Sequence, residues 1–438
     1  MSIEIITLLM VGGVFLLLSM GVPMAFGLGA VAAVAAVANF GPIGLTLVAS
    51  RVYSFMNEYV LVAVPMFILM ASIMERSGVA RDLFRAMHVW AGGIRGGLAV
   101  QTLLAAVIMA AMTGIIGGEI VLLGLIALPQ MLRLKYDKNL AIGTICAGGS
   151  LGSMIPPSLV LIIYGLTVNV SIGDLFMATV IPGLFLAGLY IVYILVRCYL
   201  NPALGPPAPL EERQMPLRQK LALLKGVILP IFIAAAVLGS IYTGVASISE
   251  AAGMGVVGTI VSAALRRELS WEMMRGALHQ TMSTLGKLLW ITFGATAFIG
   301  VYNWLGGIEF IRAMVGDLPL HPLAIVLVMM SILIVLGFFM DWIGILLLTM
   351  PVFVPVIVQL GFSPVWFGIL FCMNMQVSYL TPPFGPAAFY LKGVAPPEIS
   401  LDDIFRGLWP FIGIQLVALF VVVLFPDLAL WLPTLIYG

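Results

Sequence analysis

The chain has 438 residues, of which 62% are hydrophobic and only 9% are charged, and its formal net charge is +1. Because soluble proteins average about 25% charged residues, this composition excludes an ordinary soluble domain and predicts an all-α polytopic membrane protein. The long apolar runs exclude the short alternating segments of a membrane β-barrel. We therefore expect membrane lipid around the helices, and the near-zero net charge gives no reason to expect nucleic acid as a partner.

The N-terminal part, residues 1–58, contains two apolar runs at 5–20 and 24–48, interrupted at Gly21-Val22-Pro23. The pattern leaves open whether these runs make one or two crossings. We interpret this part as N-terminal scaffold spans, because no cleavage site precedes a polar domain. The next apolar run, 59–74, begins a first repeat that we place at residues 59–199.

A re-entrant hairpin is predicted at residues 96–132, where Glu119 is the only charged residue. Basic residues flank this segment on both sides, so the positive-inside rule places both of its ends in the cytoplasm. Its 37 residues barely suffice for two full crossings at about 20 residues each. We therefore expect a helical hairpin that opens to the cytoplasm, with its tip at residues 113–119.

A broken transmembrane helix is predicted at residues 140–167. Pro156 and Pro157 lack backbone donors, and Pro157 also disfavours the α region for Pro156. Interrupting a helix at membrane depth costs several kcal/mol for each unpaired backbone group. A chain tolerates such a break only where an ion, a substrate or a water-filled cavity uses those groups.

A proline-rich linker and connecting scaffold helices follow at residues 200–280, and a second repeat is predicted at 281–438. In this repeat only Asp341 is charged between residues 322 and 391. We expect a second hairpin at 322–360, opening outward with its tip at 337–344, and a second broken helix at 365–391. A short surface helix at 399–407 and a last span at 408–424 complete the prediction.

The two halves match in sequence at an offset of about 225 residues, as four ordered pairs indicate. They are Glu119 before Pro129 and Asp341 before Pro351; Pro156-Pro157 and Pro382-Pro383; Tyr164 and Tyr390; and Ser171 with Asp174 and Ser400 with Asp403. One hairpin is expected to open inside and the other outside. The halves are therefore predicted to be inverted repeats, an architecture of secondary transporters with a midplane site between the halves.

Each hairpin tip should meet the broken helix of its own half, 113–119 with 148–158 and 337–344 with 378–386. Carbonyl groups at helix ends can bind a dehydrated Na⁺ with Ser or Thr hydroxyls, and amides at helix N-termini favour an anionic group. The alternative is that the glycines and prolines only permit kinks and close packing. The candidate Na⁺ ligands are Thr113, Gly114, Gly117, Ser150, Gly152, Ile155, Pro156, Gly337, Asp341, Ser378, Thr381 and Pro382, and the candidate substrate-binding residues are Ser153, Pro157, Ser158, Pro383 and Gly385.

Glu119 and Asp341 are intramembrane carboxylates, which are costly unless paired or hydrated. They could bind a cation or relay protons, or they could cap the N-terminus of a hairpin helix. Apart from Na⁺, no metal or cofactor is expected, because the sequence contains no ATP-binding loop, catalytic triad or metal-ligand cluster. An intramembrane enzyme would need converging acid and base groups, and a channel would conduct without a coupling ion.

Several motifs, in order along nearly the whole chain, resemble the large membrane subunit of tripartite ATP-independent periplasmic (TRAP) transporters. They are Gly21-Val22-Pro23, Ala63-Val64-Pro65-Met66-Phe67, Ile155-Pro156-Pro157-Ser158, Met340-Asp341 and Thr381-Pro382-Pro383-Phe384-Gly385.

This resemblance implies Na⁺-driven uptake of organic acids by an elevator movement, with sodium at each hairpin tip. It also implies a small four-helix membrane subunit and a periplasmic substrate-binding protein as partners. One departure is Thr113-Gly114-Ile115-Ile116, where the family commonly has Ser-Gly-Ser-Ser. This substitution removes two hydroxyl groups but leaves backbone ligands in place.

We therefore expect a multi-pass subunit of the bacterial inner membrane that is not an enzyme and imports small organic anions with Na⁺. A stand-alone cation-coupled carboxylate transporter of similar architecture is the alternative. Uptake by this chain alone would select that alternative.

Overall fold

The computed structural model describes residues 2–91, 93–114, 117–207, 217–316 and 321–437. Within these ranges the chain is helical and contains no strand. Ile115 and Ile116, the two residues that replace family hydroxyls, and most of the proline-rich linker lie outside them. Six segments are long and apolar enough to cross a membrane among the described residues: Tyr59–Arg76, Ile172–Leu200, Ile248–Leu265, Trp271–Trp304, Trp342–Gln359 and Leu401–Leu424. Several shorter apolar helices accompany them.

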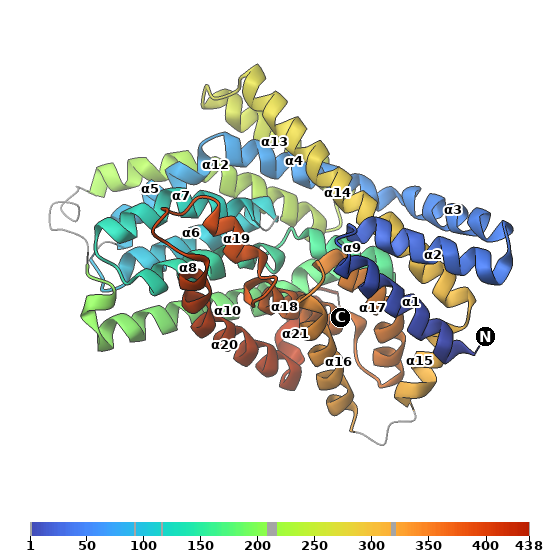
Figure 1. Ribbon diagram of the computed structural model, residues 1–438. Helices are drawn as coiled ribbons and strands as arrows, with labels where there is room; N and C mark the ends of the chain where they lie inside the picture. Colours follow the sequence, from blue (N-terminus) through green and yellow to red (C-terminus); the bar gives the residue numbers. More distant parts are fainter. Residues whose placement is uncertain (1, 92, 115–116, 208–216, 317–320, 438) are drawn as a thin grey trace.

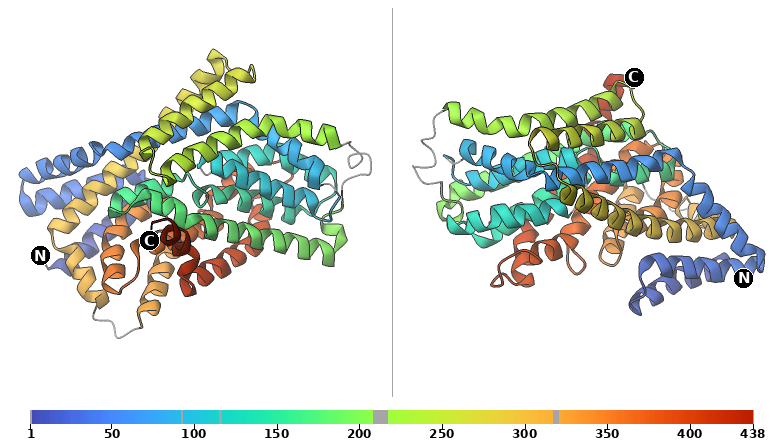
Figure 2. Two further views of the ribbon diagram at one scale, coloured as in Figure 1. Left: turned by 180° about the vertical axis from the view of Figure 1, so that it is seen from behind. Right: turned by 90° about the horizontal axis from the view of Figure 1, so that it is seen from above.

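The N-terminal part forms three helices instead of one or two spans. The predicted run 24–48 was wrong as a single segment, because the chain turns at Gly41, whose φ is +68°, and Pro42. The right-hand view of Figure 2 shows the first helices at the periphery of the molecule. The helices before the first hairpin are α1 (Ile3–Ser19), α2 (Met24–Phe40), α3 (Ile43–Met56), α4 (Ala63–Arg76), which follows a 3₁₀ turn at Tyr59–Val62, and α5 (Val79–Ala91).

The first repeat has the predicted hairpin and the predicted break. The first helix of the hairpin ends at Thr113 and the second begins at Gly118, and the helix that follows the hairpin stops at Ser150 and resumes at Leu159. Both prolines lie in this interruption, as expected from their missing amides. The elements are α6 (Gly97–Thr113), α7 (Gly118–Arg133), α8 (Lys138–Ser150), a 3₁₀ turn (Leu151–Ser153), α9 (Leu159–Val168), α10 (Ile172–Leu200) and a 3₁₀ turn (Pro202–Leu204).

The connecting helices differ from the prediction in one respect. The predicted boundary at residue 280 between the connecting helices and the second repeat lies inside a single 34-residue helix, because the charged residues of this segment do not end the helix but lie within it. This helix packs against α2, α4 and the second hairpin. The connecting elements are α12 (Leu217–Tyr242), α13 (Ile248–Leu265), α14 (Trp271–Trp304) and α15 (Gly307–Gly316).

The second repeat again shows a hairpin followed by a break, here between Leu380 and Pro386. The predicted surface helix 399–407 and span 408–424 were wrong as separate elements, because one helix runs through Pro410 at the cost of a single backbone hydrogen bond. A further helix, not predicted, follows it. The elements are α16 (Pro322–Gly337), α17 (Trp342–Gln359), α18 (Pro364–Leu380), α19 (Pro386–Lys392), α20 (Leu401–Leu424) and α21 (Asp427–Tyr437).

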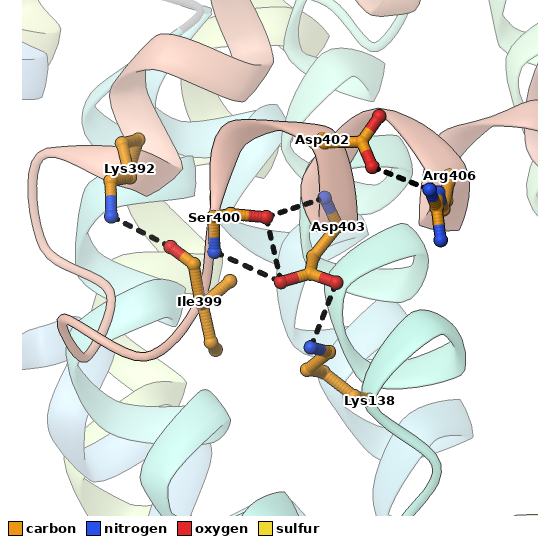
Figure 3. Close-up of polar contacts among 7 residues, drawn as sticks. All are labelled: Lys138, Lys392, Ile399, Ser400, Asp402, Asp403 and Arg406. Carbon is orange, nitrogen blue, oxygen red and sulfur yellow. Dashed lines mark hydrogen bonds and ion pairs between the residues drawn. The ribbon is translucent and has the colours of Figure 1, made fainter.

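Contacts between helix ends establish that the repeats are inverted. The amides of Gly96 and Asp137 donate to the carbonyls of Gly205 and Leu204, so the first hairpin opens beside the C-terminal end of α10. Lys138 at the start of α8 pairs with Asp403 at the start of α20, with 2.9 Å between Nζ and Oδ1 (Figure 3). The end of α10 and the start of α20 therefore lie at the same end of the molecule, so these two equivalent helices run in opposite directions.

The second hairpin opens at the other end. The hydroxyl of Tyr164, late in α9, donates to the carbonyl of Pro364 at the start of α18 (2.7 Å), and Trp366 Nε1 donates to the carbonyl of Val422 near the end of α20 (3.0 Å). Figure 1 shows the two hairpins, α6–α7 and α16–α17, approaching the middle of the molecule from different sides. We call the end that carries Lys138 and Asp403 the basic end.

Matching capping interactions confirm the duplication that the sequence indicated. Ser171 accepts a hydrogen bond from the amide of Asp174 at the start of α10. Ser400 and Asp403 form a complete capping box at the start of α20, drawn in Figure 3. The equivalent helices therefore begin with equivalent polar contacts, at opposite ends of the molecule.

Close packing between the repeats gives a test of the fold. A Cβ at Gly143 in α8 would lie 2.5 Å from the carbonyl oxygen of Gly407 in α20, whereas a Cβ at Gly188 in α10 has nothing within 4 Å. We expect Gly143→Ala to lower the free energy of unfolding by about 1–3 kcal/mol through this clash. Gly188→Ala should raise it by up to about 1 kcal/mol through helix propensity. Thermal unfolding in detergent measures both, and stabilisation by both variants would contradict the packing of α8 on α20.

Candidate functional site

The tip of the first hairpin contacts the first break, as predicted. Gly114 has a φ of +60°, and a Cβ there would lie 1.9 Å from the carbonyl oxygen of Pro157. A Cβ at Gly149, just before the break, would lie 2.3 Å from Cγ1 of Ile120. Backbone therefore meets backbone across the first tip, at a separation that only glycine permits.

The tip of the second hairpin meets the second break in the same way. A Cβ at Gly337 would lie 2.0 Å from Oγ of Ser378. Gly337, Asp341 and Ser378 line a small pocket with Tyr379 and Pro386. Each half therefore joins its own tip to its own break, which confirms the pairing expected from the sequence.

The hydroxyl groups beside the breaks donate to carbonyls of the preceding helical turn. Ser150 donates to Ala147 (2.8 Å), Thr381 to Val377 (2.6 Å) and Ser378 to Asn374 (3.3 Å). Since each hydroxyl hydrogen is used in this way, the oxygen keeps its lone pairs for another partner. Such oxygens can accept a donor or bind a cation.

Backbone carbonyls in the breaks also keep free acceptor capacity. Among the described residues, the carbonyls of Ile155, Pro156 and Pro382 accept no hydrogen bond. Gly152 lies in the 3₁₀ turn between the halves of the first broken helix, and Gly117 is the N-cap residue of α7 at the first tip. The sequence-predicted ion ligands therefore gather in two groups, one at each tip.

Glu119 does not cap α7, whose N-cap residue is Gly117. Its side chain is fully buried, and its Oε1 contacts the hydroxyl of Thr113, which also lies 3.0 Å from the carbonyl oxygen of Met109. Its Oε2 has no hydrogen-bond partner in the described part of the chain. Thr113 therefore supplies the single hydrogen-bonding contact of this carboxyl group among those residues.

Asp341 occupies the N-cap position of α17. Its side chain lies beside the amides of Trp342 and Ile343 without completing a capping hydrogen bond. It lines both the small pocket at the second tip and a larger central cavity. The two repeat-related carboxylates thus have different surroundings, one sealed and one facing open space.

The central cavity has a volume of about 390 Å³ and joins the two halves. Its walls come from both hairpin tips, from both broken helices (the first through Leu159 and Val160) and from the scaffold helices α4 and α14. The residues that line it include Gly114, Gly117, Gly118, Asp341, Trp342, Tyr379, Tyr390, Glu75, Gln280, Thr284 and Lys287. A small molecule in it would contact both repeats and the scaffold together.

The five predicted substrate residues do not line this cavity. Ser153, Pro157 and Ser158 are buried inside the first break, where Ser158 donates to the carbonyl of Ser153 (2.7 Å). Gly385 is buried against Phe405, and Pro383 is exposed elsewhere. These residues therefore lie within or beside the breaks, outside the lining of the central cavity.

Sequence reasoning missed two charged residues of the cavity, Lys287 and Glu75. Lys287 lies at the seventeenth position of the 34-residue helix α14, and it forms no ion pair among the described residues. Glu75 accepts a hydrogen bond from Gln280 (2.9 Å), and its Oε1 lies 2.0 Å from a Cβ built on Gly118. In the sequence, Glu75 directly follows the apolar run 59–74 and Lys287 directly precedes the apolar run 288–302, so each charge resembles a helix boundary although both lie within a helix.

The repeat-related tyrosines also differ. Tyr164 is fully buried and donates to Pro364, whereas Tyr390 is 41% exposed and lines the cavity. Of these two tyrosines, only Tyr390 therefore faces the cavity, while Tyr164 is sealed in the packing between the repeats.

Inverted helical repeats, re-entrant hairpins and a cavity between them define this chain as a polytopic α-helical membrane protein of the transporter class. The family described as "Tripartite ATP-independent periplasmic transporter, DctM component" matches residues 11–428. The chain therefore belongs to this family of TRAP transporter large membrane subunits, which lie in the inner membrane.

Relatives of known assignment match nearly end to end. The chain is 29% identical to the C4-dicarboxylate TRAP transporter large permease protein of Vibrio cholerae, covering 100% of this chain and 99% of that protein. It is 31% identical to the corresponding Pseudomonas aeruginosa protein, with 90% and 91% covered, and 29% identical to an ectoine/5-hydroxyectoine permease of Ruegeria pomeroyi, with 96% and 97% covered. The crystal structure of the Alcanivorax borkumensis YdaH transporter shares the fold, with a TM-score of 0.63 at 18% identity over 96% of this chain and 98% of that one.

The contact between Thr113 and Glu119 gives a test of the first tip. Thr113→Val keeps the shape of the side chain but leaves a buried carboxyl oxygen without its hydroxyl partner. We expect it to lower the free energy of unfolding by about 1–3 kcal/mol. Thr113→Ser keeps the hydroxyl and should cost only about 1 kcal/mol for the lost methyl group. Chemical or thermal unfolding of the purified protein measures the difference, and equal effects of the two variants would refute the hydrogen-bonding role.

Proposed function

We propose that this chain is the substrate-translocating subunit of a Na⁺-coupled importer of small organic anions. One observation carries the proposal: each hairpin tip seals a broken helix of its own half, and both tips line one cavity. A site at the midplane between inverted repeats is the arrangement that alternating access requires.

Sodium is proposed to bind where each tip meets its break. The groups present fit a hard cation, since they are carbonyl and hydroxyl oxygens whose lone pairs are free. Ser150, Ile155 and Pro156 would hold it with Thr113, Gly114, Gly117 and Gly152 at the first tip. Thr381, Ser378 and Pro382 would do so with Gly337 and Asp341 at the second tip. Bound sodium would offset the cost of unpaired carbonyls in the membrane and so fix each tip against its break.

The substrate is proposed to occupy the central cavity, with its anionic group at Lys287. An ammonium group in the middle of a membrane helix is costly unless it meets a counter-charge. An organic anion supplies that charge when it binds. Named relatives transport C4-dicarboxylates, sialic acid and ectoine. Ectoine differs from the first two substrates in overall charge. The substrates of the relatives therefore do not identify the substrate of this chain, which has to be determined by experiment.

An elevator movement is supported by the way in which the helices pack. The helices α2, α4, α13 and α14 pack on one another, and the repeat helices α6, α7, α8, α18 and α20 pack among themselves. The cavity lies between these two groups. Movement of the second group against the first would carry a bound substrate across the membrane, with the tips and breaks moving as one block.

A small membrane subunit and a periplasmic binding protein are the proposed partners. Reconstituted uptake of labelled succinate, N-acetylneuraminate and ectoine, with and without a Na⁺ gradient, tests the function when each partner is added separately. Uptake that needs both partners and Na⁺ supports the tripartite importer. Uptake by this chain alone would support a stand-alone carrier, and conduction without a coupling ion would contradict both.

Removing a hydroxyl at either break should weaken Na⁺ coupling. We expect Ser150→Ala and Thr381→Ala each to raise the Na⁺ concentration for half-maximal uptake by about tenfold, the loss of one contact to a charged group. Thr243→Ala is the control, since Thr243 is exposed outside both tips. Uptake measured against Na⁺ concentration gives the result, and unchanged Na⁺ dependence in both break variants would contradict these assignments.

Replacing Lys287 should weaken binding of the anion without changing the Na⁺ response. We expect Lys287→Met to raise the KM for the transported anion by about tenfold or more. Lys287→Arg keeps the positive charge, so its KM should be close to that of the parent protein. The initial rate of uptake against substrate concentration measures the effect. Identical KM values in the methionine and arginine variants would show that the charge of Lys287 does not bind the substrate.

A further inference from the structure

A second polar cavity lies at the basic end, away from both hairpin tips. Its volume is about 190 Å³, and it is enclosed by the start of α8, the end of α10 and the start of α20. Its polar lining is Asp137, Asn139, Tyr193, Arg197 and Arg406. The two arginines come from different repeats, so the cavity exists only because α10 and α20 are antiparallel.

The charges of this cavity leave guanidinium donors available. Arg197 forms no ion pair among the described residues, and its guanidinium carbon lies 5.9 Å from the ring centre of Tyr193. Arg406 uses one nitrogen to pair with Asp402 (2.7 Å, Figure 3), and an arginine has five N–H donors. The carboxylate of Asp137 already accepts the amide of Leu140. The cavity therefore contains two positive groups and one carboxylate, and that carboxylate already accepts a hydrogen bond from the backbone.

The surroundings of the cavity place it at the membrane surface. Leu200 and Trp409 lie three residues after Arg197 and Arg406, so each lies on the same helix face as its arginine. Leu200 is 80% exposed and Trp409 is 55% exposed. Tryptophan and arginine together are typical of the headgroup level, and exposed apolar side chains next to them can contact acyl chains. The positive-inside rule predicts that this surface faces the cytoplasm.

We propose that this cavity binds the phosphate group of an anionic membrane lipid in the cytoplasmic leaflet. Two arginines can hold phosphate oxygens with paired N–H donors, and basic pockets between membrane helices on this side suit anionic headgroups. A free phosphate offers the same chemistry to the arginines. The exposed Leu200 and Trp409 favour the lipid, because a free phosphate would leave them without a partner. A bound lipid would join the two repeats where α8, α10 and α20 meet.

The test uses the full-length chain, stripped of lipid in detergent and titrated with cardiolipin, phosphatidylglycerol, phosphatidylcholine or inorganic pyrophosphate. Native mass spectrometry and the thermal unfolding midpoint report binding. We expect both anionic lipids to bind and to raise the midpoint, and phosphatidylcholine and pyrophosphate to have little effect. Arg197→Gln and Arg406→Gln should each weaken the anionic-lipid affinity about fivefold.

The matched control is the double variant Arg81→Gln with Arg275→Gln, which removes two exposed arginines outside this cavity. It should bind lipid as the parent protein does. If Arg197→Gln with Arg406→Gln fails to fold, Asn139→Leu provides a variant that keeps the net charge and should also weaken binding. Pyrophosphate binding that depends on both arginines, without binding of the anionic lipids, would overturn the lipid as the ligand of this cavity. Equal lipid and pyrophosphate binding by the parent, cavity and control variants would overturn the proposal.

Discussion

The requirement that backbone polar groups be satisfied inside a membrane governs this structure. An unbroken helix meets that requirement by itself, but the helices that contain Pro156 and Pro382 do not. The chain places a hairpin tip against each break, and glycines at 114 and 337 let the two segments touch. The hydroxyls of Ser150 and Thr381 each donate to a carbonyl of the preceding helical turn, so their oxygens keep lone pairs for another partner. The breaks are therefore tolerable because tertiary packing surrounds them with polar groups.

Inversion of the repeats converts two local features into one shared cavity. Since α10 and α20 run in opposite directions, the hairpins enter from opposite ends and their tips converge near the middle. Near the tips, however, the surroundings of equivalent residues differ between the two halves. Tyr164 is packed under α18, whereas Tyr390 lines the cavity, and Glu119 is sealed while Asp341 is open to it. Divergence after duplication has therefore sealed the tyrosine and the carboxyl group of the first half in packing, and has left their counterparts at the central cavity.

Charge is rare in this protein, and several of the charged residues lie where separate groups of helices meet. Lys287 and Glu75 come from the scaffold helices and line the central cavity together with Asp341. Lys138 and Asp403 join the repeats at the basic end, close to the cavity that contains Arg197 and Arg406. Within a chain that is 9% charged, these positions mark the contacts between separately packed groups of helices. A membrane segment keeps such charges only where a counter-charge, a ligand or water is available.

The sequence by itself determined the class, the duplication, both hairpins and both breaks, because each depends on local signals: apolar length, basic flanks and adjacent prolines. It also indicated which tip meets which break. It did not determine that Gly41 and Pro42 end a helix, that α20 continues through Pro410, or that Lys287 lies inside α14, since packing against neighbouring helices decides whether a local signal ends a helix. Only the tertiary structure decided that Glu75, Lys287 and Asp341 share a cavity, because Glu75 lies more than 200 positions before the other two and meets them only when the scaffold packs against both tips.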